Sequence, residues 1–572
     1  MPLPYLRQTP GGTQLIVDGA PALLLGGQVH NSAPSSPPYM RAIFDRMESM
    51  SVGTVIGSAS WALIEPDEGS FDFSLVDAQI AEARTRGMRL VLIWFGAFKN
   101  AASTYTPRWV RADICRFPRA VVNPAVKAVF SYPGAMPKAV LSVFSPQLLA
   151  ADRTAFTQLM RHLAVADPGH VVVMVQVENE IGLLGDSRDR STAAEAAWQQ
   201  PVPPALLAYL EANADRLRPE LAELRVRSEG TKAETWEGVF GGDWQAEEVF
   251  MAWAFASYVE SLAAAGKAVK ALPMYVNAWL GPQPGQPKAG DYPSGGPASR
   301  VLDVWKAAAP SVDLLAPDIY IPDVQSAMAS YDRPDNPLFV PESQFRTGSL
   351  FWALGYHRAI GFSVFGIEDG RRDSQLAAAY ALLAPMQGVI TAAQAQDRIA
   401  GILLDEDGAE ASFTLGDLQV VARGTRHLLS RMLLDAGVEP PPPATPSSET
   451  EGPAVLPASA DSRPFAILIA EADDDFLLVG QGVTVDFAHD TDIVEVDQAE
   501  EGRFFGGRWI PGRVLNGDER LLMLPADGVG AVRIRLLRIA TSAPDANAGS
   551  AGKEEVDPAE ERLAAVRGGA GR

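Results

Sequence analysis

The sequence predicts an α/β fold, a (β/α)8 TIM barrel followed by a smaller β-sandwich-like domain, and three observations carry this prediction. Up to about residue 395, short β-rich apolar runs alternate with longer amphipathic stretches. Several of these runs are apolar throughout, as expected of parallel strands that helices cover on both faces. After residue 395 the runs are short and strand-like, and Asp/Gly turns separate them, which is typical of a β-rich unit.

Eight apolar runs are the predicted strands of the barrel. In chain order they are 22–27, 53–57, 89–95, 171–177, 272–277, 312–316, 338–340 and 361–365. The segment 148–164 is a predicted helix, because its apolar residues recur at helical spacing with charged residues between them. Eight strand–helix alternations favour a closed barrel, and a doubly wound open sheet is the competing architecture.

Two long connections, 96–147 and 181–271, follow the third and fourth predicted strands. Both therefore leave the barrel at the carboxyl ends of its strands, where a barrel keeps its active site. The second connection contains two predicted helices, 204–216 and 246–269, so we interpret it as an ordered insertion.

The chain divides into three predicted parts. Residues 1–395 form the catalytic barrel and residues 396–540 form a β-rich accessory domain, which a Pro-rich stretch at 440–457 interrupts as an exposed loop. Residues 541–572 are rich in Ala, Gly, Asp and Glu and contain no aromatic residue. This composition predicts a disordered tail.

The composition excludes several classes of function. The 572-residue chain has a formal charge of −22 and a pI near 4.8, which argues against nucleic acid or an anionic membrane surface as partner. A single cysteine, Cys115, excludes an intramolecular disulfide, and six histidines are scattered without ligand spacing, so we expect no metal site and no cofactor. Neither a membrane-spanning run nor a signal peptide is visible. We therefore expect a cytoplasmic protein, or a periplasmic one if a leader was removed; the oligomeric state stays open.

Two carboxylates at strand ends are the candidate catalytic residues. The fourth predicted strand runs into Glu180, and the short seventh strand stops at Glu342. Ionised carboxylates rarely end a buried strand without a partner or a task. Hydrolysis of a glycosidic bond needs one carboxylic acid that protonates the leaving oxygen and a second carboxylate that acts at the anomeric carbon. Glu180 and Glu342 face each other across the predicted barrel mouth and fit these two tasks.

At these motifs the chain resembles glycoside hydrolase family 35, the β-galactosidases, within the retaining clan whose catalytic glutamates follow the fourth and seventh strands. The run Q-V-E-N-E-I-G at 176–182 matches the family's Q-[VI]-E-N-E-x-G. The run W-A-L-I-E-P-D-E-G-S-F-D-F at 61–73 resembles its W-x-x-x-E-P-x-x-G-x-F-D-F, and L-G-G-Q-V-H at 25–30 fits the first strand. The resemblance covers roughly residues 15–370.

The chain departs from the family at three places. Glu342 is followed by Ser-Gln-Phe where the family commonly shows E-[FY]-x-x-G-W, and Ser58 stands where the family has a tyrosine. The run 94–100 reads W-F-G-A-F-K-N in place of the family's G-P-Y-x-x-A-E segment. These departures indicate a divergent bacterial subgroup that pairs the barrel with a β-rich domain containing E-G-R-F, W-I-P-G-R and N-G-D, and this chain carries that pattern at 501–518.

The resemblance implies a role for four residues. Glu342 would be the nucleophile of a double displacement and Glu180 its general acid/base. Asn179 would bind the sugar 2-hydroxyl, and Tyr320 would hydrogen-bond the nucleophile. Glu178 is interpreted as a supporting group on the same strand face as Glu180, because strand side chains repeat every two residues.

Five more residues are substrate-binding candidates from their positions alone. A sugar needs hydrogen bonds to its hydroxyls and an aromatic face for its C–H patch. Residues of suitable type end the predicted strands: His30 the first, Trp94 the third, Asn277 and Trp279 the fifth, and Glu368 the eighth.

Together these observations predict a retaining exo-glycosidase that removes terminal β-D-galactosyl residues from a saccharide. Two alternatives stay open. One is another retaining glycosidase of the clan, such as an endo-glycanase or a β-glucosidase-like enzyme. The other is a non-catalytic carbohydrate-binding barrel, which the presence of both Glu180 and Glu342 disfavours, since binding alone does not require the pair.

Overall fold

The computed structural model describes residues 2–123, 140–227, 234–406, 408, 410–439 and 463–541. The predicted Pro-rich loop at 440–457 lies outside the described residues, and so does the predicted tail apart from its first residue.

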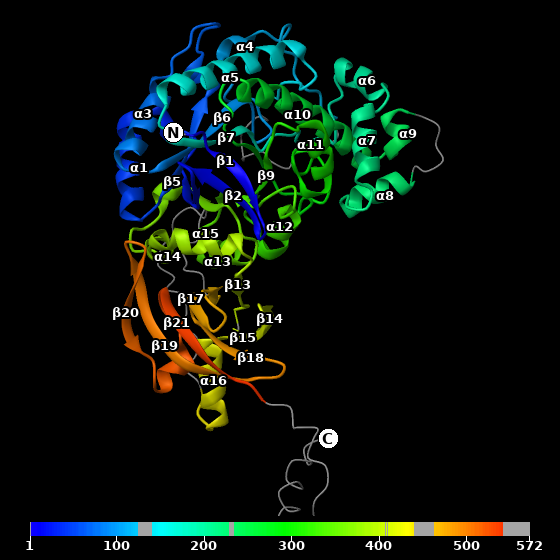
Figure 1. Cartoon of the computed structure of the whole chain (residues 1–572). Helices are drawn as coiled ribbons and strands as arrows, with labels where there is room; N and C mark the ends of the chain where they lie inside the picture. The colour runs from blue at the N-terminus through cyan, green and yellow to red at the C-terminus, as the bar shows by residue number, and fades with distance from the viewer. Residues whose placement is uncertain are drawn as a thin grey trace, which may run out of the picture.

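A closed barrel of parallel strands forms the first part of the chain (Figure 1). Its strands are β4 (Leu24–Gln28), β5 (Thr54–Ser60), β6 (Arg89–Lys99), β7 (Val172–Asn179), β8 (Met274–Trp279), β9 (Leu314–Ile319), β10 (Phe339–Val340), β11 (Glu342–Ser343) and β12 (Gly361–Phe365). The last strand, β12, pairs in parallel with the first, β4. The strand order follows the chain throughout and closes on itself. This confirms the predicted barrel, because a doubly wound sheet reverses its strand order.

The seventh strand of the barrel is divided at Pro341. Before the proline, β10 pairs with β12; after it, β11 pairs with β9, with Glu342 opposite Asp318. Proline has no backbone N–H to donate to a ladder, so it interrupts the strand. The break places Glu342 at the very start of β11, at the carboxyl end of the barrel.

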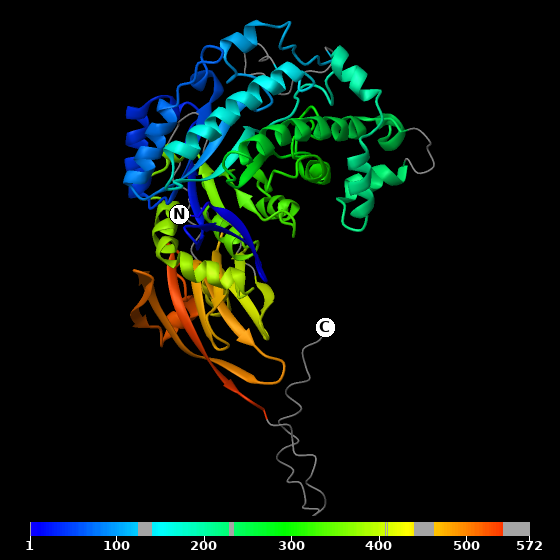
Figure 2. The same ribbon diagram turned by 45° about the horizontal axis from the view of Figure 1, so that its top comes forward.

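Helices surround the barrel (Figure 2). They are α1 (Pro37–Ser49), α2 (Trp61–Ile64), α3 (Ser74–Thr85), α4 (Arg108–Ala112), α5 (Pro146–Ala166), α10 (Trp244–Lys267), α11 (Leu302–Ala308), α12 (Val324–Tyr331), α13 (Thr347–Gly355), α14 (Gln375–Leu383) and α15 (Gln387–Ala395). The predicted helices 148–164 and 246–269 are α5 and α10. By length and composition α10 and the stretch Gln375–Ala395 could cross a membrane, but at least half of each apolar window is buried in the fold, as in core helices of globular proteins.

The long connection after β7 forms a helical lobe beside the barrel. Its helices are α6 (Thr192–Trp198), α7 (Pro204–Ala212), α8 (Pro219–Arg227) and α9 (Trp236–Phe240). In Figures 1 and 2 they lie to one side, next to α10 and α11. The connection is an ordered insertion in its described residues, and the predicted helix 204–216 is α7, which ends four residues earlier.

A small sheet closes the amino end of the barrel. It consists of β1 (Tyr5–Thr9), β2 (Gly12–Val17) and β3 (Ala20–Ala22). Leu15 and Val17 pack with the apolar residues that fill the barrel interior, among them Ile56, Ile93 and Tyr275. No strand is predicted before residue 22, so β1 and β2 are visible only in the structure.

The second part of the chain is a β-sandwich. One sheet has the strand order β13 (Ile399–Leu403), β16 (Phe465–Ala470), β17 (Asp475–Gln481), β21 (Gly530–Ile539), β19 (Ile493–Phe505) and β20 (Arg508–Val514). The other has β14 (Ala411–Leu415), β15 (Leu418–Gly424) and β18 (Val483–Ala488), and α16 (Thr425–Asp435) follows β15. The two sheets share one apolar core. The larger sheet also packs against the barrel, where Phe465 contacts Phe351 of α13 at 4.7 Å between ring centroids.

Candidate active site

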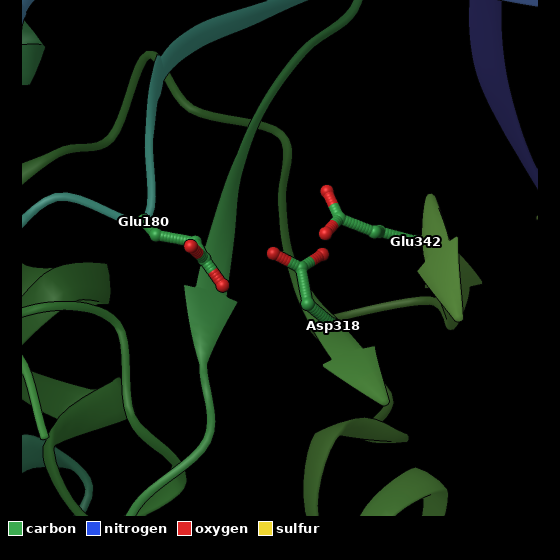
Figure 3. Close-up of side chains that lie close together, drawn as sticks. All are labelled: Glu180, Asp318 and Glu342. Carbon is green, nitrogen blue, oxygen red and sulfur yellow. The ribbon is translucent and has the colours of Figure 1, made fainter. Parts of the chain in front are cut away.

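Three buried carboxyl groups meet at the carboxyl end of the barrel (Figure 3). Glu180 directly follows β7, Asp318 lies near the end of β9, and Glu342 begins β11. One oxygen of each carboxyl group lies within 4.8 Å of the other two. The structure therefore brings together the two glutamates that the sequence predicts as a pair, and it adds Asp318 to them.

The backbone around Glu180 has an unusual conformation. Glu178 and Glu180 have φ angles of 62° and 43°, a region that residues other than glycine adopt at a cost of about 1 kcal/mol or more. The segment after β6 holds this turn in place: the Asn100 N–H donates to the Asn179 carbonyl at 3.0 Å, and the Ala101 N–H donates to the Glu180 carbonyl at 3.2 Å. Such conformations cluster at functional sites, where the surrounding structure fixes them.

The conformation of Glu178 breaks the alternation of side chains along β7. The prediction that Glu178 lies on the same strand face as Glu180 is therefore wrong. The Glu178 carboxyl group accepts the N–H groups of Ala97 at 3.1 Å and Phe98 at 2.7 Å, beside Asp152 of α5. Burial, and then the nearby Asp152 carboxyl, raise the pKa of Glu178 well above its usual range. Glu178 therefore holds the end of β6 on the side that faces α5.

Two side chains from the end of β6 contact the β7 turn. The Lys99 ammonium donates to the Asn179 side-chain oxygen at 2.7 Å, and the Asn100 amide donates to a carboxyl oxygen of Glu180. The Asn179 side-chain nitrogen has no hydrogen-bond partner within the described part of the chain. Buried polar groups are rarely left unpaired, so this donor is a candidate partner for a ligand hydroxyl.

The environment of Glu180 favours its protonated form. Burial, followed by the negative charge of Glu342, raises the pKa of Glu180 to about 7, and Lys99 and the Asn100 hydrogen bond oppose this rise. Asp318 has its pKa raised well above the usual range, first by burial and then by Glu342 and Glu180. At neutral pH the cluster therefore retains protons that isolated carboxyl groups would release.

Two neutral side chains donate hydrogen bonds to the Glu342 carboxyl group. The Tyr320 hydroxyl donates to its Oε1 at 2.6 Å, and the Gln28 amide donates to its Oε2 at 2.8 Å. Hydrogen bonds from donors stabilise the charged form of a carboxyl group. The two glutamates thus have different hydrogen-bond partners: Asn100 donates to Glu180, and Tyr320 and Gln28 donate to Glu342.

A cavity of about 530 Å³ lies over the three carboxyl groups. Besides them, Asn100, Trp279, Tyr320 and the loop 280–286 line it, and the Trp279 indole N–H donates to Gln286 at 3.0 Å. A larger cavity, about 660 Å³, lies in the sandwich. We place the candidate site in the barrel, because three buried carboxyl groups line its cavity.

The other predicted sugar contacts lie elsewhere. The Trp94 indole is fully buried and donates to Asp152 at 2.8 Å behind β6, so it is a core residue and offers no face to a sugar. Asn277 is buried as well; its side-chain oxygen accepts the Glu180 N–H at 2.8 Å, so it positions the acid.

His30 and Glu368 do not line this cavity. The His30 N–H donates to Glu368 at 2.9 Å, and the His30 ring contacts Asp369 at 2.8 Å. One carboxyl oxygen of Glu368 is buried without a partner within the described residues. The pair lies at the ends of β4 and β12, on the same rim of the barrel.

Sequence reasoning missed Asp318, Gln28, Lys99 and Asn100. A signal existed for Asp318, since the run Ala-Pro-Asp-Ile-Tyr at 316–320 also ends an apolar strand at a carboxylate. Three carboxyl groups at this spacing could also hold a metal ion, and the prediction that the site contains no metal stays a prediction.

Comparison with known proteins gives a partial match. A model of glycoside hydrolase family 42, described as "Beta-galactosidase", matches residues 36–204, and a "Domain of unknown function" model matches residues 376–524. A β-galactosidase of Xanthomonas manihotis is 34% identical over 85 residues, which is 14% of this chain and 14% of that protein. The chain thus matches about one seventh of the length of this curated relative.

Solved structures give a weaker match. The β-galactosidase of Rahnella sp. R3 is 15% identical with a TM-score of 0.41, covering 65% of this chain and 57% of that chain. The β-galactosidase of Marinomonas ef1 is 12% identical with a TM-score of 0.42, covering 64% of this chain and 60% of that chain. Similarity at this level carries no argument about function.

The family model corrects the resemblance to family 35, because the match is to family 42. The coarser expectation holds: residues 36–204, which contain Asn179 and Glu180, carry the sequence pattern of a β-galactosidase-type glycoside hydrolase.

Proposed function

We propose that the protein is a retaining exo-β-galactosidase, in which Glu180 is the general acid/base and Glu342 the nucleophile. The observation that carries the proposal is the contrast between the two buried glutamates. Glu180 has a pKa raised to about 7, whereas Glu342 accepts hydrogen bonds from Tyr320 and Gln28. The closest oxygens lie within 4.8 Å, which fits the carboxyl separation of about 5–5.5 Å in retaining enzymes.

The proposed reaction has two steps. The Glu342 carboxylate attacks the anomeric carbon, while the Glu180 carboxylic acid gives its proton to the leaving oxygen, so the glycosidic bond breaks and a glycosyl ester forms. Glu180, now ionised, then takes a proton from water, whose oxygen attacks the same carbon and releases Glu342. The net reaction consumes one water and restores both glutamates.

The cavity supports a role for the surrounding residues. The unpartnered Asn179 amide would donate to a sugar hydroxyl next to the anomeric carbon. Trp279 lines the cavity and would offer an aromatic surface. Removal of a terminal residue is part of the proposal, and residues of the loop 280–286 that line the cavity would contact that residue.

A panel of aryl glycosides tests the proposed function. The protein is expected to hydrolyse the β-galactoside at least about tenfold faster, in kcat/KM, than the β-glucoside, the α-arabinoside or the β-xyloside, since hydrogen-bonded hydroxyls discriminate strongly. Preference for another sugar would support a different glycosidase of the clan. Absence of hydrolysis with every substrate, together with measurable sugar binding, would support a non-catalytic barrel.

Removing the charge of Lys99 is expected to shift the pH dependence of kcat/KM. Glu180 must be protonated to donate, so kcat/KM should fall as pH rises through about 7. Lys99 lowers the pKa of Glu180; Lys99→Met should therefore move the alkaline limb upward by about one unit. Lys99→Arg keeps the charge and is the matched control. A limb that stays in place or moves downward in Lys99→Met would contradict the assignment of Glu180 as the acid.

A further inference from the structure

The two carboxyl oxygens of Asp318 have different surroundings. Oδ2 accepts the Asn277 amide at 2.6 Å. Oδ1 is buried and has no hydrogen-bond donor among the described residues. Its carboxyl group lies between those of Glu180 and Glu342, as Figure 3 shows, and ionised carboxylates only accept hydrogen bonds. A buried acceptor without a donor is costly, so the arrangement is satisfied only if Asp318 itself donates.

The groups around Asp318 support the same conclusion. Glu342 and Glu180 act on it with negative charge, and Lys99 is the cation that opposes them. The Tyr275 hydroxyl from β8 is buried and has no partner among the described residues, and burial is the main cause that raises the pKa values of Tyr275, Tyr320 and Tyr331. These tyrosines are neutral and do not compensate a third negative charge.

We propose that Asp318 is a positioning residue, which stays protonated through the reaction and donates from Oδ1 to whichever of the two glutamates is ionised. This inference rests on the proposed function. In the free enzyme the ionised member is Glu342. In the glycosyl-enzyme, Glu342 is esterified and the ionised member is Glu180. Asp318 gains and loses no proton, because the transferred proton moves from Glu180 to the leaving oxygen and returns from water.

A carboxylic acid that burial keeps neutral can serve as a hydrogen-bond donor. Here the donor would stabilise each carboxylate in turn without adding a charge to the cluster. It would also keep the negative charge near Glu180 at one unit in the free enzyme, so that Glu180 does not bind its proton too tightly to transfer it. Asp318 thereby acts through the glutamates and needs no contact with the sugar.

Two substitutions test the inference by kinetics. Asp318→Ala removes the donor and is expected to lower kcat/KM by about 10- to 100-fold, the cost of a charge-assisted hydrogen bond. Asp318→Asn keeps the shape and an N–H donor, so its kcat/KM should fall clearly less than that of Asp318→Ala. The alkaline limb of its kcat/KM pH profile should stay within about half a pH unit of the wild type. If Asp318 were ionised, Asp318→Asn would remove a negative charge beside Glu180 and move that limb downward by about one unit or more. That shift would overturn the inference.

Infrared spectroscopy tests the protonation state without turnover. The difference spectrum of wild type minus Asp318→Asn at pH 7 should contain the C=O stretch of a protonated carboxylic acid. The buried Glu178 and Asp152 contribute to both proteins and cancel. Absence of the band in a protein that hydrolyses glycosides would overturn the inference about Asp318 and leave the proposed function standing. Presence of the band in a protein that hydrolyses no glycoside would instead refute the proposed function.

Two controls complete the test. Circular dichroism and thermal unfolding check that each variant folds. If Asp318→Asn does not fold, Asp318→Ala provides the reference spectrum in its place. Activity that is lost on chelation and restored by a divalent cation would also overturn the inference, because carboxyl groups that hold a cation are ionised.

Discussion

Replacing Glu342 by glutamine is expected to abolish turnover, lowering kcat on an aryl β-galactoside by at least about 10³-fold. The amide cannot form the glycosyl ester, and no other described carboxyl group that lines the cavity accepts hydrogen bonds from both Tyr320 and Gln28. The side chain keeps its size between Tyr320 and Gln28, so the fold should be retained. Steady-state kinetics and thermal unfolding on the same preparation measure both effects.

The matched control is Glu211→Gln, a substitution of the same kind on an exposed position of α7, which should leave the rate unchanged. Glu342→Ala makes room for azide and should give the α-galactosyl azide, since a small anion then attacks from the side of the missing carboxylate. Near-normal turnover by Glu342→Gln would remove Glu342 from the mechanism.

Replacing Glu180 by alanine is expected to have the second largest effect, a loss of about 10²- to 10⁴-fold, the range for general acid/base catalysis. The loss should depend on the leaving group. An alkyl β-galactoside needs protonation of its leaving oxygen, so it should be affected far more than a dinitrophenyl β-galactoside, which leaves without help. Kinetics with both substrates measure this difference.

Azide provides an independent check of Glu180. In Glu180→Ala, azide needs no general base and should react with the glycosyl-enzyme to give the β-galactosyl azide, with a rise in the rate on the activated substrate. Equal losses on both classes of substrate, or no rate increase with azide, would contradict the role of Glu180 as acid/base. Opposite anomers of the azide from the two alanine variants would assign the two glutamates separately.

The barrel could be predicted from the sequence because its signal is local and repeated. Each of the eight apolar runs became a strand, and their order follows the chain. The amino-terminal sheet was not predicted, because β1 to β3 are short and their role is to cover the barrel interior with Leu15 and Val17. That role depends on tertiary contacts and leaves no separate periodic pattern.

Parts of the site could not be predicted, because the sequence does not show which face of a strand points into the barrel. Along β6, Ile93 and Phe95 face the barrel interior, so alternation turns Trp94 outward against α5. The sequence pattern alone cannot tell which of the two faces is inside. At Glu178 the alternation itself fails, because the left-handed turn at φ 62° rotates the side chain to the other face.

Asp318 shows a different limit of sequence reasoning. The end of the same strand predicts a role for Tyr320, whose hydroxyl does contact Glu342. No role was predicted for Asp318, two residues earlier. Only the register of β9 with β11, which sets Asp318 opposite Glu342, brings the third carboxyl group into the cluster. Pairing between distant strands is not encoded in any short motif.

The most direct test of the central claim is the configuration of the first sugar released. Proton NMR during hydrolysis of an aryl β-galactoside should show the β-anomer of galactose first, with the α-anomer appearing later through mutarotation. Two displacements at one carbon, by Glu342 and then by water, require this retention. Initial release of the α-anomer would mean a single displacement and would contradict the assignment of Glu342 as nucleophile and Glu180 as its acid/base.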